Sequence, residues 1–151
     1  MTHDQIARVR ASWGLVLPVA PTFASLCYER LFALDPSLRD LFARADVGAL
    51  ERKLVHTLAM IVAGIDDLRQ LAPAIELLGR RHVGLGVTGA HYRSMRDAIL
   101  WTLGRALGDG FDADTRRAWE VAYDALVAAM NPGPGRDSAS DAAIATTVRV
   151  P

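Results

Sequence analysis

Apolar residues recur every three or four positions along most of the chain, which is the spacing of one buried face of an α-helix. The clearest such face combines Leu50, Leu54, Leu58, Ile61 and Ile65. No alternation of apolar and polar residues typical of a strand persists over a window of six residues. The pattern therefore predicts an all-α fold, with helices too unequal in length for a symmetric four-helix bundle.

Prolines, glycines and capping residues predict where these helices begin and end. Thr2 followed by Gln5 has the pattern of a capping box, and Asp35-Pro36 is typical of a helix restart. The expected helices cover residues 3–17, a stretch from Pro18 to Leu34, residues 36–42, 47–65 and 68–84, a stretch from Thr88 to Gly108, and one from Asp112 to Met130.

The composition fits one globular domain with a tail. Hydrophobic residues make up 51% of the 151 positions, which is enough for a core and a small-molecule pocket. We expect the domain to cover residues 1–130. Residues 131–151 begin with Asn-Pro-Gly-Pro-Gly and contain few large apolar side chains, which is typical of a flexible tail.

The charge balance and the cysteine content indicate which classes of partner and which cellular compartment to expect. The 17 basic and 17 acidic residues balance, so we expect no nucleic-acid or membrane partner. The apolar run over residues 54–65 is interrupted by His56 and Gly64 and is too short to span a bilayer. Cys27 is the single cysteine, and no secretory signal is recognisable, so the expected location is cytoplasmic.

His82 is the residue whose position is hardest to explain by packing alone. Leu71, Ile75 and Leu78 precede it at helical spacing, so its imidazole lies on an apolar face. An imidazole that loses hydration needs a backbone carbonyl, a buried polar group or a metal as its partner. From the pattern alone, a satisfied core histidine and a metal ligand both remain open.

Four features together resemble the single-domain bacterial globins, which are similar to the haem domain of flavohaemoglobins. The run from Leu31 to Phe42 resembles the family's helix-turn-helix ending in the phenylalanine that packs on haem. The segment Arg80-Arg81-His82, followed by Gly84, Val87 and His91-Tyr92, resembles the segment that carries the proximal histidine. Asp46-Val47, Leu50 and Lys53-Leu54 resemble the start of the distal helix, and Tyr28 falls where these globins place a distal tyrosine.

This resemblance implies a globin fold that holds haem b, with His82 as the iron ligand. The other ring N–H of His82 would be donated to a backbone carbonyl or a similar acceptor. The implied cofactor-binding residues are Phe42, Lys53, Leu54, Leu58, Leu78, Arg81, Val87, Tyr92 and Met95. The implied distal ligand pocket consists of Tyr28, Leu50 and Leu54.

The distal pocket departs from the family pattern at Leu50, where relatives commonly have glutamine or histidine. A leucine can neither donate a hydrogen bond nor coordinate iron, so we expect five-coordinate ferrous iron, with Tyr28 as the single donor to bound gas. Packing of Tyr28 without that role is the alternative. A register slip of one turn would place Val47 or Lys53 over the iron instead.

Other polar and aromatic residues have simpler interpretations. Lys53 and Arg81 would pair with haem propionates or remain solvated. His56 lies on a different face from Leu54, and Cys27 is expected to be a small buried hydrophobe. Tyr92 resembles the proximal tyrosine of flavohaemoglobins, which works with a glutamate, but no glutamate follows Met130.

The resemblance leaves three functions open. The first is reversible binding of dioxygen and other diatomic gases for transport, storage or scavenging. The second is nitric oxide dioxygenase or another haem redox activity, which requires a separate reductase because the chain has no dinucleotide fingerprint. The third is a gas sensor, for which the tail is the one available output element. A haem-free helical domain is the structural alternative.

Overall fold

The computed structural model describes residues 1–131, and these form an all-α domain. Its elements are α1 (His3–Val16), η1 (Leu17–Val19), α2 (Ala20–Leu34), α3 (Leu38–Leu41), α4 (Val47–Ala63), η2 (Leu68–Leu71), α5 (Ala72–Gly84), α6 (Gly89–Leu107), η3 (Gly108–Gly110) and α7 (Ala113–Met130). The described residues contain no strand, as the periodicity predicts. The expected tail lies outside the described residues, except for Asn131.

Polar side chains cap four of the helices as the sequence suggests. Thr2 and Gln5 form the reciprocal bonds of a capping box at α1, while Thr88 and His91 form a similar pair at α6. Asp46 caps α4, and Asp112 accepts the backbone N–H of Thr115 at α7. The caps of α4 and α6 fix the first turns of two helices that carry candidate site residues.

Two predicted helices are wrong in extent. Residues 36–42 were expected to be helical, but α3 begins only at Leu38, because Asp35 bonds the backbone N–H and hydroxyl of Ser37 and holds a turn there. Residues 68–84 do not form one helix. The Asp67 side chain caps the 3₁₀ turn η2, and α5 starts afresh at Ala72 with Pro73 in its first turn.

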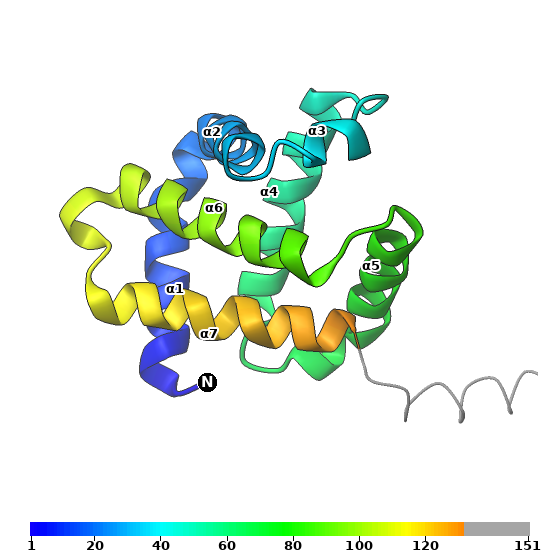
Figure 1. Ribbon diagram of the computed structural model, residues 1–151. Helices are drawn as coiled ribbons and strands as arrows, with labels where there is room; N and C mark the ends of the chain where they lie inside the picture. Colours follow the sequence, from blue (N-terminus) through cyan, green and yellow to red (C-terminus); the bar gives the residue numbers. More distant parts are fainter. Residues whose placement is uncertain (132–151) are drawn as a thin grey trace, which may run out of the picture.

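The helices pack in two crossing layers (Figure 1). Helices α6 and α7 lie side by side at the front, α1 and α4 cross behind them, and α2 lies at the top, where it is viewed nearly along its axis. Helix α5 lies at one end, where it packs mainly on α7. In this arrangement α4 and α5, the two helices with the strongest site candidates, are not a closely packed pair.

The crossing of α1 and α7 is held by aromatic packing and one buried hydrogen bond. The rings of Trp13 and Trp119 meet edge to face at 6.3 Å, and Trp119 Nε1 donates to Ser12 Oγ at 2.9 Å. The tryptophans expected to be packing residues, Trp13 and Trp119, are 4% exposed. A satisfied indole in the core fixes the α1–α7 crossing more specifically than apolar contact alone.

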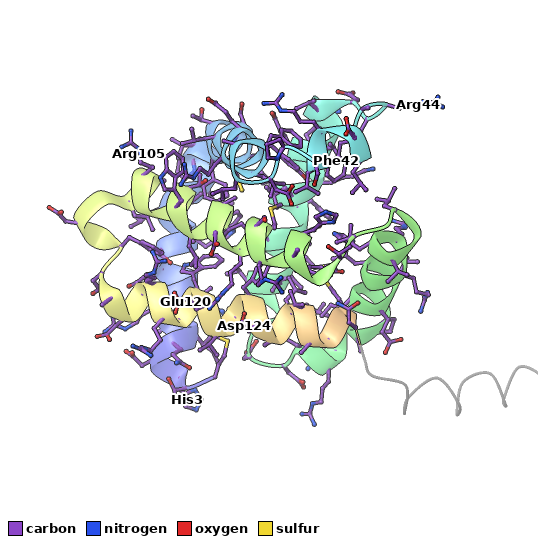
Figure 2. All side chains as sticks on the ribbon, viewed as in Figure 1. His3, Phe42, Arg44, Arg105, Glu120 and Asp124 are labelled. Carbon is purple, nitrogen blue, oxygen red and sulfur yellow. The ribbon has the colours of Figure 1, made fainter. Side chains whose placement is uncertain are left out.

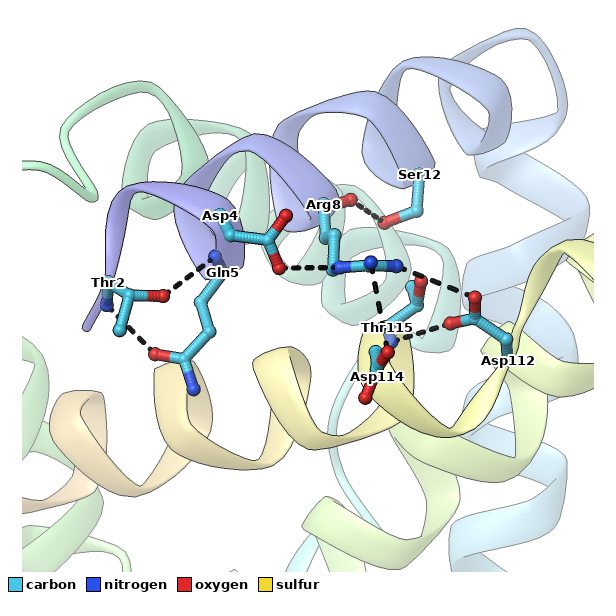
Figure 3. A network of polar contacts seen from close by, with 8 residues as sticks. All are labelled: Thr2, Asp4, Gln5, Arg8, Ser12, Asp112, Asp114 and Thr115. Atoms are coloured by element: carbon cyan, nitrogen blue, oxygen red, sulfur yellow. Dashed lines mark hydrogen bonds and ion pairs between the residues drawn. The ribbon is translucent and has the colours of Figure 1, made fainter.

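Near the same crossing, a polar network joins the start of α1 to the start of α7 (Figure 3). Arg8 lies 2.8 Å from Asp4 on its own helix and 3.4 and 3.8 Å from Asp112 and Asp114 on α7. Exposed ion pairs of this kind contribute little to stability. The network therefore orients two helix ends and is not a candidate functional site.

One apolar stretch meets the length and hydropathy expected of a membrane span. It covers residues 3–34 across α1 and α2, with a mean hydropathy of 1.2 in its most apolar window. Val9, Trp13, Phe23 and Cys27 of this stretch are core residues of the folded domain. Its apolar character is explained by packing against the other helices.

Candidate functional site

His82 lies in the last turn of α5 with one ring nitrogen already bonded. Its Nδ1 is 2.8 Å from the backbone carbonyl oxygen of Leu78, and the side chain is half-buried. A carbonyl oxygen only accepts, so Nδ1 is the nitrogen that carries the proton. In the neutral imidazole the lone pair is then on Nε2, and the backbone carbonyl is the kind of partner expected from the sequence.

Helix α5 is held against α7 by a close backbone approach. A Cβ atom on Gly79 would lie 2.0 Å from the carbonyl oxygen of Met130, so only glycine fits at this position. Ile75 is fully buried in the same contact, beside Leu126 and Met130. The tight contact fixes the helix one turn before His82.

Tyr92 packs on the His82 ring from the first turn of α6. The two rings are stacked, with centroids 6.0 Å apart and planes 15° apart. Tyr123 of α7 donates its hydroxyl to the carbonyl of Tyr92 at 2.8 Å, and burial raises the pKa of Tyr123. The Tyr92 hydroxyl is buried without a partner in residues 1–131, so no glutamate bonds it there.

Three aromatic rings gather at the C-terminal half of α2. Tyr28 and Phe42 meet edge to face at 6.4 Å, and Phe32 lies 6.1 Å from Tyr28 and 6.2 Å from Phe42. Figure 2 shows Phe42 at the turn that leads from α3 toward α4, with Arg44 pointing outward beyond it. The three rings connect α2 to this turn.

Tyr28 is the polar group of this aromatic cluster. It is 8% exposed, and its hydroxyl makes no hydrogen bond within the described part of the chain. Burial raises its pKa to about 12, with smaller contributions from Cys27 and Glu51. The phenol therefore stays neutral at physiological pH and keeps a proton that it can donate.

Helix α4 presents the apolar face that the sequence predicted. Leu54 and Leu58 are buried, at 9% and 5% exposed, while Leu50 in the first turn is half-buried. Asp46 caps the helix through the backbone N–H of Gly48, which sets where the helix begins. Which of these residues faces a ligand stays a prediction.

The candidate site residues fall into two separate hydrophobic clusters. The cluster on the α2 and α4 side contains or contacts Tyr28, Phe42, Leu50, Leu54, Leu58 and Met95. The cluster on the α5 and α7 side is contacted by Leu78 and Tyr92. The distal candidates and the proximal candidates are thus divided between the two halves of the core.

This division fits a flat apolar cofactor. Phe42, Leu50, Leu78, Val87 and Met95 are half-buried, although each is apolar. The Nε2 lone pair of His82 and the Tyr28 hydroxyl both lack a protein partner among the described residues. Apolar walls with one imidazole nitrogen and one neutral donor suit a porphyrin with an axial ligand.

The remaining candidates are at the surface. Lys53 and Arg81 are exposed and form no ion pair within the described residues, so their pairing with propionates stays a prediction. His56 is exposed, as expected. Cys27 is fully buried and burial raises its pKa to about 12, which confirms that it is an inert thiol.

Sequence reasoning missed Phe32, Gly79 and Tyr123. Phe32 lies four residues after Tyr28 on α2, so helical spacing could have placed the two rings together. Gly79 interrupts an apolar helix three residues before His82, and such a glycine often marks a close approach. Nothing in the sequence indicates that Tyr123 bonds the Tyr92 carbonyl, because that contact joins two distant helices.

Comparison with known proteins agrees with this geometry. Residues 25–130 match the family model described as Globin, which covers α2 to α7. The chain belongs to the globin family. This globin is 26% identical to neuroglobin-1 of Oncorhynchus mykiss over 146 residues, which cover 88% of the chain and 92% of the relative. It is also 28% identical to the neuroglobins of Tetraodon nigroviridis and Chaenocephalus aceratus. Each of these matches extends over 138 residues, which cover 83% of the chain and 87% of the relative.

Membership of the family confirms the expected fold, and globins are haem-binding proteins that take up diatomic gases. The similar relatives named here are vertebrate neuroglobins. The more specific resemblance to bacterial globins and to flavohaemoglobin haem domains therefore stays a prediction.

Proposed function

We propose that this globin binds haem b through Nε2 of His82 and takes up dioxygen reversibly at a five-coordinate ferrous iron. The observation that carries the proposal is the bond between His82 Nδ1 and the Leu78 carbonyl. It fixes the orientation of the ring, so that in the neutral imidazole the Nε2 lone pair has a set direction, which is what a proximal ligand requires.

The residues divide the work between the two faces of the pocket. His82 would hold the haem, and the haem iron would supply the chemistry that takes up a diatomic gas. Tyr28 offers a neutral hydroxyl that can donate to the gas, at about 1 kcal/mol for one hydrogen bond. Leu50 excludes water from the pocket and offers no competing ligand.

Non-covalent attachment is part of the proposal. The chain contains one cysteine, Cys27, and this thiol is fully buried in α2. A thioether bond to the cofactor would need an accessible thiol beside the porphyrin edge. This supports haem b held by His82 and by the apolar walls.

Absorption spectra of the purified protein in ferric, ferrous and carbonmonoxy forms test the proposal. We expect a Soret band and a five-coordinate ferrous spectrum. His82→Ala should lose the proximal nitrogen and change the spectrum, while His56→Ala, which changes an exposed histidine on α4, should not. Haem uptake by His82→Ala with an unaltered spectrum would contradict the proposal. A second protein nitrogen in the ferrous form would contradict five-coordination, and absence of a Soret band would indicate a haem-free domain.

Stopped-flow mixing of the oxygenated protein with nitric oxide, with and without a reductant, separates gas binding from turnover. The enzymatic alternative needs a reductase partner, and the unpartnered Tyr92 hydroxyl does not favour a flavohaemoglobin-like proximal side. That alternative, the sensor role and a cytoplasmic location stay predictions.

A further inference from the structure

A groove of about 530 Å³ lies between the first turns of α6 and the last turns of α7. Its volume falls within the range of small-molecule sites. Val87, Val127 and Ala128 give it an apolar wall, and Tyr92 forms part of its lining. The groove shares Val87 and Tyr92 with the proposed haem site, while its other lining residues, on α6 and α7, have no role there.

Charged groups in the groove are unbalanced. Arg93 and Arg96 line it together with one carboxylate, that of Asp124, which leaves one net positive charge. Arg96 Nε lies 3.4 Å from Asp124 Oδ1, but this buried nitrogen makes no hydrogen bond. Figure 2 shows Asp124 on the part of α7 that lies next to α6. The Arg96 side chain is partly exposed, lines the groove and has, among the described residues, only this ion pair with Asp124, so its other N–H groups are available to an anion in the groove.

Arg93 adds a second positive charge that an anion in the groove could neutralise. It is exposed and forms no ion pair with any other described residue. Its Nη1 lies 3.7 Å from where a Cβ on Gly89 would be, which places the guanidinium over the first residue of α6. A cation at the positive end of a helix is unfavourable unless an anion lies beside it.

We propose that this groove binds a small organic anion with an apolar body, of the medium-chain monocarboxylate class. The guanidinium groups of Arg93 and Arg96 hold the carboxylate, while Val87, Val127 and Ala128 contact the hydrocarbon. Because Tyr92 both lines the groove and stacks on His82, the bound anion lies one side chain away from the proposed iron ligand.

Calorimetric titration of the haem-loaded, full-length protein with octanoate tests the proposal. We expect saturable one-to-one binding with a sub-millimolar Kd. Octanamide has the same hydrocarbon without the charge, and it should bind at least about tenfold more weakly. No saturable binding, or equal binding of octanamide, would overturn the proposal. Because haem is already in place, this failure is distinct from failure to bind haem.

Variants locate the site. Arg93→Gln and Arg96→Gln should each weaken octanoate binding by about tenfold, and Asp124→Asn should strengthen it because it removes the competing carboxylate. Arg117→Gln, an exposed arginine elsewhere on α7, should have no effect. In the diamagnetic carbonmonoxy form, octanoate should shift amide NMR signals of residues 87–96 and 123–131. Unchanged affinity in Arg93→Gln, or shifts confined to other residues, would contradict the assignment.

Discussion

The proximal and distal sides of the proposed haem site are built differently. On the proximal side, His82 is bonded to the Leu78 carbonyl, and its helix lies against the α7 backbone at Gly79. On the distal side, Tyr28 is held by ring packing, its hydroxyl has no partner within residues 1–131, and Leu50 is half-buried. The proximal side is fixed through main-chain contacts. On the distal side, the Tyr28 hydroxyl can form a hydrogen bond to a ligand without breaking one within the described residues.

This difference predicts that mutations on the two sides change different measured properties. Changes on the proximal side should alter the free energy of unfolding, because a backbone contact cannot be repacked cheaply. Changes on the distal side should alter ligand kinetics at nearly constant stability, because no native hydrogen bond is lost there.

The largest effect is expected from Gly79→Ala. The new Cβ would lie 2.0 Å from the Met130 carbonyl oxygen, so α5 must shift away from α7. We expect a loss of about 3 kcal/mol in the free energy of unfolding, measured by urea denaturation, because overpacking against backbone forces a rearrangement. Gly84→Ala is the matched control in the same helix. Its Cβ would meet nothing within 4 Å, so it should be neutral or slightly stabilising.

Tyr28→Phe should change the rate of dioxygen dissociation more than it changes the free energy of unfolding. Loss of the donor should speed dioxygen dissociation about tenfold in stopped-flow experiments, while the free energy of unfolding stays within about 0.5 kcal/mol. Tyr123→Phe is the converse control. It removes the bond to the Tyr92 carbonyl and should cost about 1 kcal/mol of stability, with little change in dissociation. Unchanged dissociation in Tyr28→Phe would show that this hydroxyl is not the distal donor.

A smaller effect is expected from Leu50→Gln. The amide adds a second donor on the first turn of α4, so dioxygen dissociation should slow several-fold and autoxidation should change. Both rates are measured on the oxygenated protein. If neither rate changes, the register that places Leu50 over the iron is wrong.

The smallest effect concerns alkaline pH. Burial raises the pKa of Tyr28 from 10.0 to about 12. Between these values the unfolded chain releases a proton that the folded chain keeps, so stability is unaffected below about pH 10 and falls above it. Urea midpoints at about pH 8 and about pH 11 should show this fall, and Tyr28→Phe should reduce it. An equal fall in the variant would mean that other groups cause it.

Most of the fold could be predicted from periodicity, because each helix buries one continuous face. Leu54, Leu58 and Ile61 are buried as their spacing requires. The two errors in helix extent arose where single hydrogen bonds decide the backbone. Asp35 holds Ser37 in a turn, and Asp67 caps a 3₁₀ segment. Local chemistry of this kind competes with the pattern and is not visible in it.

The candidate site was predictable only in part. His82 and the carbonyl partner of its ring could be expected from an imidazole on an apolar helix face. The need for glycine at position 79 could not, because it depends on the Met130 carbonyl, which is brought there by tertiary packing. Periodicity shows which face of a helix is buried, but not which distant residue lies against it.

The described residues 1–131 form two hydrophobic clusters, and haem bound between them as proposed would couple folding to the supply of the cofactor. Haem bound as proposed would stabilise only the native state. The free energy of unfolding would rise by about 4 kcal/mol at a free haem concentration one thousand times the Kd. Newly made chains therefore gain resistance to proteolysis as porphyrin becomes available. Under the proposed function, the cellular level of the intact protein would follow the haem supply.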